Sequence, residues 1–156
     1  MLLGLACGAP EGHRPPAPVP AGWIHYTHGL VSFDHPAQWT VATRPLGDEA
    51  LDVFLSSSVG GGERCLLALH FGMEPRFPTM ERMKPFAKRA FDTRIGGARA
   101  RRIAPLELPG SSEGILELGG KGPLHLAHFR YADLDAPTRG AVEQVLASLR
   151  NQAPGH

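Results

Sequence analysis

The chain is poor in cysteine, in net charge and in long apolar runs, and each shortage excludes a class of protein. Its two cysteines, Cys7 and Cys65, have no cysteine or histidine partner at zinc-binding spacing, which excludes a disulfide-rich scaffold and a zinc module. The net charge of +1 with eight histidines counted as neutral gives no global attraction to nucleic acid. No segment approaches the about 20 consecutive apolar residues of a membrane-spanning helix. We therefore expect a globular domain with no cofactor, no metal and no nucleic-acid partner.

Length and composition predict a single domain. The 156 residues are 42% hydrophobic and 20% charged, an ordinary globular balance. Glycine and proline total 34 residues and are concentrated near the N-terminus and in turn-like clusters. We divide the chain into residues 1–21, an apolar start with a proline-rich linker, residues 22–150, the folded domain, and residues 151–156, a disordered tail.

The N-terminus is apolar up to Cys7 and is followed by "APEGHRPPAPVPAG", a semi-rigid spacer. An apolar run that ends in small residues and a cysteine resembles the end of a bacterial lipoprotein signal peptide, in which the cysteine becomes lipidated. Only six residues precede Cys7, fewer than such a signal needs, so we expect the true start codon to lie upstream. The alternative is a disordered N-terminus of a cytoplasmic protein.

Apolar periodicity predicts an α+β fold with a mainly antiparallel sheet covered by helices. Trp23 to His35 indicates a hairpin around Gly29, and residues 64–72 indicate a central strand with Cys65 as a buried thiol. A helix, bent or restarted at Pro85, is predicted over residues 78–94. A second helix is predicted after Asp135 as the N-cap, with Pro137 near its first turn and an apolar stripe of Val142, Val145, Leu146 and Leu149. Further strands are expected at 38–44, 50–57, 95–108, 113–120 and 123–132, the last two as a hairpin.

Three motifs in order resemble the PsbP/Mog superfamily. The stretch "GLVSFDHPAQWTV" fits its "G-x-x-F-x-x-P-x-x-W-x-V" signature through Gly29, Phe33, Pro36, Trp39 and Val41, with Phe33 one place late. "IGGARARRI", with Gly96 and Gly97, resembles the family's "GG-x-x-A" strand, and "VLASLR" resembles its closing helix.

The resemblance covers about residues 22–150. It implies an α/β/α sandwich that acts by binding, without a common catalytic residue set. Bacterial relatives resemble lipoproteins or small chaperones, including chaperones that clasp apolar helices of type VI secretion effectors.

The neighbouring Asp34 and His35 invite a catalytic interpretation, but catalysis would need a nucleophile or a metal as a third member. We instead predict a corner made by Asp34, His35 and Pro36, with Asp34 bonding nearby backbone amides. Phe33 and Trp39 are expected to enter the core from adjacent strands.

A basic cluster lies between Glu81 and Arg102, and it is the candidate surface for an acidic partner or an anionic membrane. The alternative is a solvated helix face and an outward strand face. Its members are Arg82, Lys84, Lys88, Arg89, Arg94, Arg99, Arg101 and Arg102.

"GSSEG", with Ser112 at its centre, matches the G-x-S-x-G pattern of a hydrolase nucleophile elbow. The elbow requires a strand before the serine and a helix after it, whereas "ILEL" follows here as a predicted strand, so we predict a hairpin loop.

We expect a non-enzymatic, membrane-tethered binding or accessory domain of the bacterial cell envelope, on its periplasmic side, with a protein partner. The alternatives are a cytoplasmic chaperone or adaptor of the same fold and, more remotely, a small envelope hydrolase.

Overall fold

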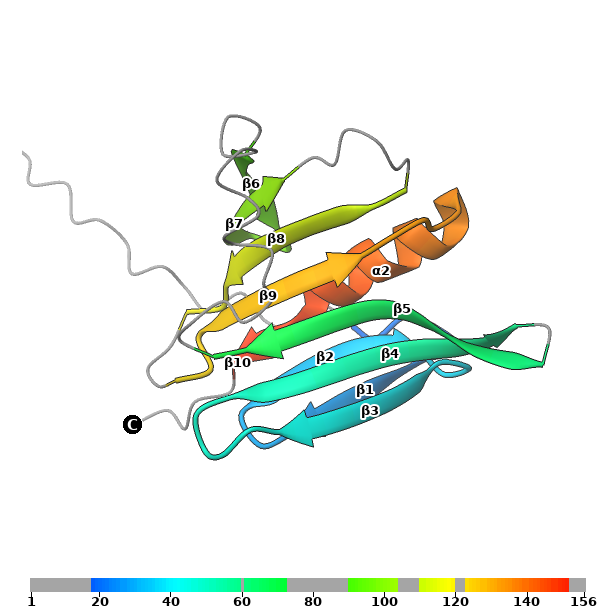
Figure 1. The fold of residues 1–156 in the computed structure, drawn as a ribbon, viewed down its shortest axis with the longest axis horizontal. Coiled ribbons are helices and arrows are strands. Elements are labelled where there is room, and N and C mark those ends of the chain that lie inside the picture. Colours follow the sequence, from blue (N-terminus) through cyan, green and yellow to red (C-terminus); the bar gives the residue numbers. More distant parts are fainter. Residues whose placement is uncertain (1–17, 60, 73–89, 104–109, 120–122, 152–156) are drawn as a thin grey trace, which may run out of the picture.

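A computed structural model describes residues 18–59, 61–72, 90–103, 110–119 and 123–151. These residues form two antiparallel sheets and one α-helix (Figure 1). The larger sheet has seven strands, which are, in spatial order, β3 (Thr40–Pro45), β4 (Leu51–Val59), β5 (Gly62–Phe71), β9 (Leu126–Tyr131), β8 (Ser112–Glu117), β7 (Ala98–Ile103) and β6 (Ala90–Ile95). The smaller sheet has three, in the order β1 (Trp23–His28), β2 (Val31–Pro36) and β10 (Arg150–Asn151).

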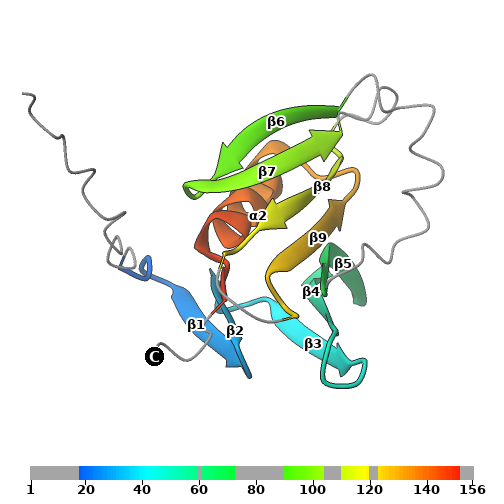
Figure 2. The ribbon, with the colours of Figure 1, turned by 90° about the vertical axis from the view of Figure 1, so that its left-hand side faces the viewer.

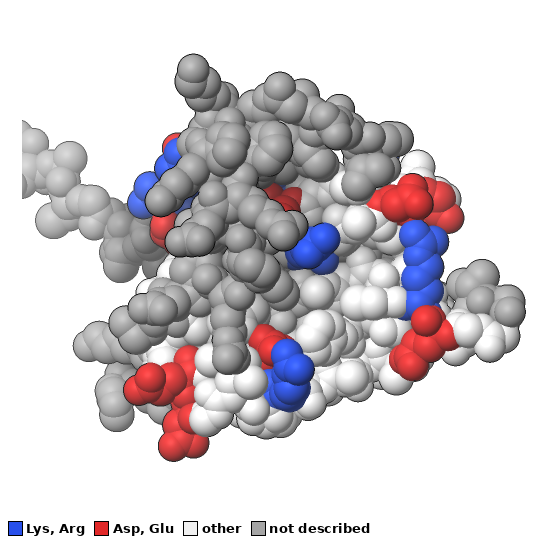
Figure 3. All heavy atoms as spheres, viewed as in Figure 1, with Lys and Arg blue, Asp and Glu red and all other residues white. Residues whose placement is uncertain are grey.

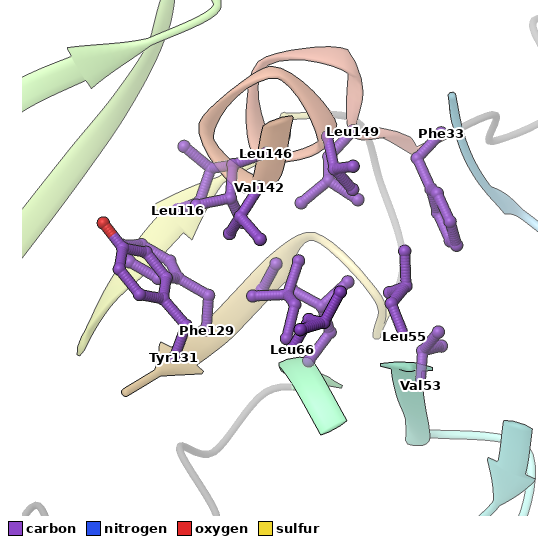
Figure 4. Packing of buried hydrophobic residues seen from close by; sticks show 14 of the residues in the cluster. Phe33, Val53, Leu55, Leu66, Leu116, Phe129, Tyr131, Val142, Leu146 and Leu149 are labelled. Atoms are coloured by element: carbon purple, nitrogen blue, oxygen red, sulfur yellow. The ribbon is translucent and has the colours of Figure 1, made fainter. Parts of the chain in front are cut away.

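The helix α2 (Ala136–Ser148) lies against one face of the seven-stranded sheet, with β1 and β2 beside its C-terminal end (Figure 2). Val142, Leu146 and Leu149 point toward side chains of the larger sheet, and Phe33 joins them from β2 (Figure 4). The helix and both sheets therefore share one hydrophobic core. Within the described ranges, no helix has the length and apolar character to cross a bilayer.

The sequence signals for α2 are confirmed. Asp135 is the N-cap, and its carboxylate accepts a hydrogen bond from the backbone N–H of Thr138 at 2.8 Å. Pro137 occupies the first turn, where no intrahelical N–H is needed. The predicted apolar stripe is buried: Val142, Val145, Leu146 and Leu149.

The predicted α/β/α sandwich is wrong. The described part of the chain is mostly antiparallel strand, and its single helix covers one face of the larger sheet. The last residues of the predicted 78–94 helix, from Ala90, instead form β6, which pairs with β7 from Ala90↔Ile103 to Ile95↔Ala98. The four-residue spacing of Phe91 and Ile95 is compatible with a strand as well as with a helix. The hairpin is favoured because Gly96 and Gly97, which join the two strands, both have the positive φ that a two-residue hairpin turn requires. Residues 78–89 lie outside the described residues.

The predicted corner at Asp34, His35 and Pro36 is also wrong, because all three belong to β2. Cross-strand pairing with β1 continues through Trp23↔Pro36, so the chain turns only at residues 37–39. Phe33 and Trp39 are both buried, as expected, with Trp39 just before β3.

Cys65 is exposed, against the prediction of a buried thiol. A register shift explains the error, because Leu55 pairs with Leu67 while Ser56 pairs with Cys65. Leu66 is thus an extra residue in β5, and both Leu66 and Leu67 are buried. This β-bulge reverses the alternation of faces that the sequence pattern assumed.

Three further predictions are confirmed. The β1–β2 hairpin turns at Gly29, β5 is an interior strand of the larger sheet, and β8 pairs with β9. Asn151 pairs with Val31 as part of β10, one residue beyond the predicted end of the domain.

Candidate functional site

A groove of about 550 Å³ lies on the outer face of the three-stranded sheet. Its floor is set by strand alternation: His25 pairs with Asp34, and Arg150 pairs with Ser32, so these side chains share one face. The C-terminal end of α2 and residues 18–20 complete the lining, which comprises Pro18, Val19, Pro20, Trp23, His25, Ser32, Asp34, Gln144, Ala147, Ser148 and Arg150. Its volume is within the range of ligand pockets.

Polar groups in the groove are already oriented by hydrogen bonds. His25 Nδ1 lies 2.7 Å from Asp34 Oδ1, with the histidine side chain 49% exposed and the aspartate 16%. The backbone N–H of Asp34 donates to Ser148 Oγ at 2.8 Å. Since these groups hold one another in place, the groove presents a pre-formed polar floor.

The arrangement lacks the geometry of a nucleophile relay. The Ser148 hydroxyl donates to the Val145 carbonyl at 2.8 Å, so its proton is bonded to the helix backbone and not to His25. A serine nucleophile instead requires its hydroxyl to face a base. The His25–Asp34 pair is therefore better suited to orienting a bound group than to activating Ser148.

The Arg150 side chain lies at the C-terminal end of α2, beside the groove. Its Nη1 donates to the carbonyls of Ala147 and Leu149 at 2.9 and 2.7 Å. Carbonyls in the last turn of a helix lack intrahelical partners and carry partial negative charge. Arg150 thus neutralises the helix end and also contributes a cation to the groove.

None of the groove residues was predicted as a site residue, because three distant segments supply them. One signal was available in the sequence. A hairpin whose loop is Gly29–Leu30 must place residue 25 opposite residue 34, so the His25–Asp34 pair follows once the loop is assigned. The contribution of α2 and residues 18–20 has no such local signal.

Three of the four described members of the basic cluster share one face of the β6–β7 hairpin, because Arg94 is the cross-strand partner of Arg99 and Arg101 follows Arg99 by two residues. On β7, Arg102 faces α2 and forms an ion pair with Glu143 at 2.6 Å, whereas the exposed Arg99 and Arg101 lie on the opposite face. Arg94 is exposed on β6 and donates to the Gly97 carbonyl at 2.8 Å. The remaining four members, Arg82, Lys84, Lys88 and Arg89, lie outside the described residues, as does Cys7.

Figure 3 shows the side on which the larger sheet lies in front of α2. Where described atoms are visible, acidic and basic side chains lie close to one another. This part of the surface therefore shows no large patch of a single charge sign.

A row of mostly buried polar side chains crosses the face of the larger sheet opposite α2. Asp52 is 2.6 Å from both Arg44 Nη2 and His70 Nδ1, and His70 lies opposite His128 across the β5–β9 pair. His128 Nε2 in turn lies 2.9 Å from Glu113 Oε1. Burial alone would raise the pKa of Asp52, but hydrogen bonds and positive charge from His70 and Arg44 outweigh it and hold that pKa below its usual value.

This row is best explained as structural. Arg44, Asp52, His70 and His128 are successive cross-strand partners on four neighbouring strands. A one-residue slip of any strand would break these bonds, so the row fixes the register. In the part of the chain described here, no group of three or more His, Cys, Asp or Glu side chains could hold a metal ion.

Ser112 is the first residue of β8, so a strand and not a helix follows it. The prediction that Ser112 lies in a hairpin loop is therefore wrong, and the geometry of a nucleophile elbow is absent at this serine.

Comparison of the chain with protein-family models, curated proteins and solved structures finds no match.

Proposed function

We propose that the protein is a non-enzymatic binding domain, tethered to the bacterial cell envelope through a lipidated Cys7, and that a segment of a protein partner binds in the groove beside α2. The observation that carries the proposal is the groove itself. It combines apolar side chains, such as Trp23 and Val19, with the oriented His25–Asp34 pair and Arg150. Such a mixture of apolar surface and a few convergent polar groups is typical of binding sites.

The C-terminal end of the proline-rich linker lies beside the groove, which supports the proposal that the tether and the binding site are close together. Pro18, Val19 and Pro20 end the proline-rich stretch and also line the groove. A spacer rich in proline is semi-rigid and extended. A partner bound in the groove would therefore be held close to the point where the tether joins the domain.

Site-specific photo-crosslinking tests the binding site. A photoreactive amino acid replaces Gln144, which lines the groove, and in a matched control replaces Ser58, which is exposed on β4. We expect a discrete crosslinked partner from position 144 only. Adding His25→Ala should weaken this crosslink about 5- to 30-fold, the effect of losing one or two kcal/mol. Equal crosslinking from both positions, or no effect of His25→Ala, would refute the groove as the site.

Fatty-acid labelling tests the tether. The gene is expressed from its native locus with its upstream DNA, as wild type and as Cys7→Ser. Label that depends on Cys7 supports the envelope lipoprotein. Absence of label from an expressed protein would contradict the tether and favour a cytoplasmic adaptor that uses the same groove.

A further inference from the structure

The four edge strands of the described sheets differ in how they are protected. Edge strands expose unpaired backbone groups, and proteins guard them with charged residues or proline. β3 carries Arg44 and Pro45, β6 carries Asp92 and Arg94, and the short β10 carries Arg150. β1 reads WIHYTH and contains no Asp, Glu, Lys, Arg or Pro.

β1 is also regular and accessible. Its pairing with β2 runs without a register shift from Trp23↔Pro36 to His28↔Val31. The described residues place no strand at its other edge. Ile24 is 48% exposed, which makes it the most exposed of the large hydrophobic side chains among the described residues. β1 therefore offers six residues of extended backbone for a further antiparallel strand.

We propose that β1 pairs with β1 of a second copy of this chain about a two-fold axis, which joins two three-stranded sheets into one of six strands. The β1 edge meets its own copy without like-charge repulsion, because none of its six residues is Asp, Glu, Lys or Arg. The contact is isologous, so it uses both β1 edges at once and stops at a dimer. It also removes Ile24 from water.

The symmetry places both grooves on one side. The two-fold axis of an antiparallel strand pair is perpendicular to the sheet, so equivalent faces of the two copies point the same way. Trp23 and His25 are on the groove face of β1, and residues 18–20 line the same groove. Both tethers would then reach a single membrane. This last consequence rests on the proposed function, but the strand pairing does not.

Sedimentation equilibrium of the full chain tests the pairing. The apparent mass should rise with concentration from 16.7 kDa toward twice that value. Ile24→Lys should weaken self-association at least about tenfold, because a lysine on an edge strand disfavours the addition of a second strand. Phe91→Lys is the matched control: Phe91 is 47% exposed and lies on the guarded edge strand β6. It should leave self-association unchanged.

A distance measurement keeps the proposal testable if Ile24→Lys fails to fold. A nitroxide is attached to Thr27→Cys in β1 and, as a control, to Ser58→Cys in β4, both in a Cys7→Ser/Cys65→Ser chain. Dipolar coupling between labels at Thr27 and its absence at Ser58 would support the pairing. Coupling at Ser58 alone, or at neither position, would overturn it.

Three results of the mass measurement would also overturn the proposal. One is a mass of a single chain at every concentration, and another is a dimer that Ile24→Lys leaves intact. The third is a dimer that Phe91→Lys weakens as much as Ile24→Lys does. The crosslink from position 144 tests the groove independently of the mass and distance measurements, which test the strand pairing. Failure of the pairing and failure of the proposed function are therefore distinguishable.

Discussion

Arg102 on β7 and Glu143 on α2 form a two-point contact, in which Arg102 Nη2 donates to both carboxylate oxygens at 2.6 and 2.7 Å. The Tyr131 hydroxyl donates to the same carboxylate at 2.6 Å, and the Arg102 guanidinium lies 5.3 Å from the centroid of the Phe129 ring. The two side chains of the pair are 18% and 32% exposed, so they are partly shielded from water. This network fastens the helix to strands β7 and β9.

Arg102→Ala should lower the free energy of unfolding by about 2–3 kcal/mol, because it removes hydrogen bonds between charged groups and leaves Glu143 without its cation. The control is Arg101→Ala, which truncates the next residue on the exposed face and should change stability by less than about 0.5 kcal/mol. Urea unfolding at neutral pH measures both. Equal losses in the two variants would contradict a structural role specific to Arg102.

Tyr131 should make the fold sensitive to high pH. Burial, together with its hydrogen bond to the negatively charged Glu143, raises the pKa of Tyr131 to about 12, against about 10 for an unperturbed tyrosine. Between these values the folded state holds a proton that the unfolded state has lost. The free energy of unfolding should therefore fall as pH rises from about 10 to about 12.

Urea unfolding across this pH range, compared between wild type and Tyr131→Phe, measures that effect. The variant should be less stable at pH 9 but lose less stability as the pH rises further. Ultraviolet titration should show that its late tyrosinate signal is missing. A variant with the same pH dependence as wild type would refute the assignment.

Asp52 should make the free energy of unfolding fall at low pH, whereas Tyr131 makes it fall at high pH. Its pKa is held below the usual aspartate value by His70 and Arg44, so its stabilising effect is present above about pH 4 and is lost as pH falls further. Asp52→Asn should lower stability at neutral pH by about 1–3 kcal/mol and flatten the acid limb of the stability curve. Chemical denaturation from pH 6 to pH 2 tests this. Asp48→Asn, at an exposed turn position, should reproduce neither effect.

Local signals predicted much of the fold because they act over a few residues. The Asp135 cap and the stripe from Val142 to Leu149 define α2, and the loop at Gly29 defines the β1–β2 hairpin. These features need only hydrogen bonds and periodicity within one element or one hairpin.

The errors come from information that is not local. The bulge at Leu66 depends on how β4 and β5 align, so alternation counted within β5 alone misplaced Cys65. Arg102 and Arg101 cannot be separated into internal and surface residues before α2 is docked on one face of the sheet. The groove requires the packing of the small sheet against the end of α2, which no single segment encodes.

The Gly96–Gly97 turn offers a test of how closely the β6–β7 hairpin approaches α2. Both glycines have positive φ, +56° and +85°, so alanine at either position should cost about 1–2 kcal/mol of backbone strain. A Cβ at Gly96 would clash with the Ala147 carbonyl oxygen, whereas a Cβ at Gly97 would meet nothing within 4 Å. Gly96→Ala should therefore cost about 1–3 kcal/mol more than Gly97→Ala, as measured by urea unfolding. Since both variants carry the same φ penalty, the difference isolates the contact with the helix. Equal losses would mean that the hairpin can move away from α2 at little cost.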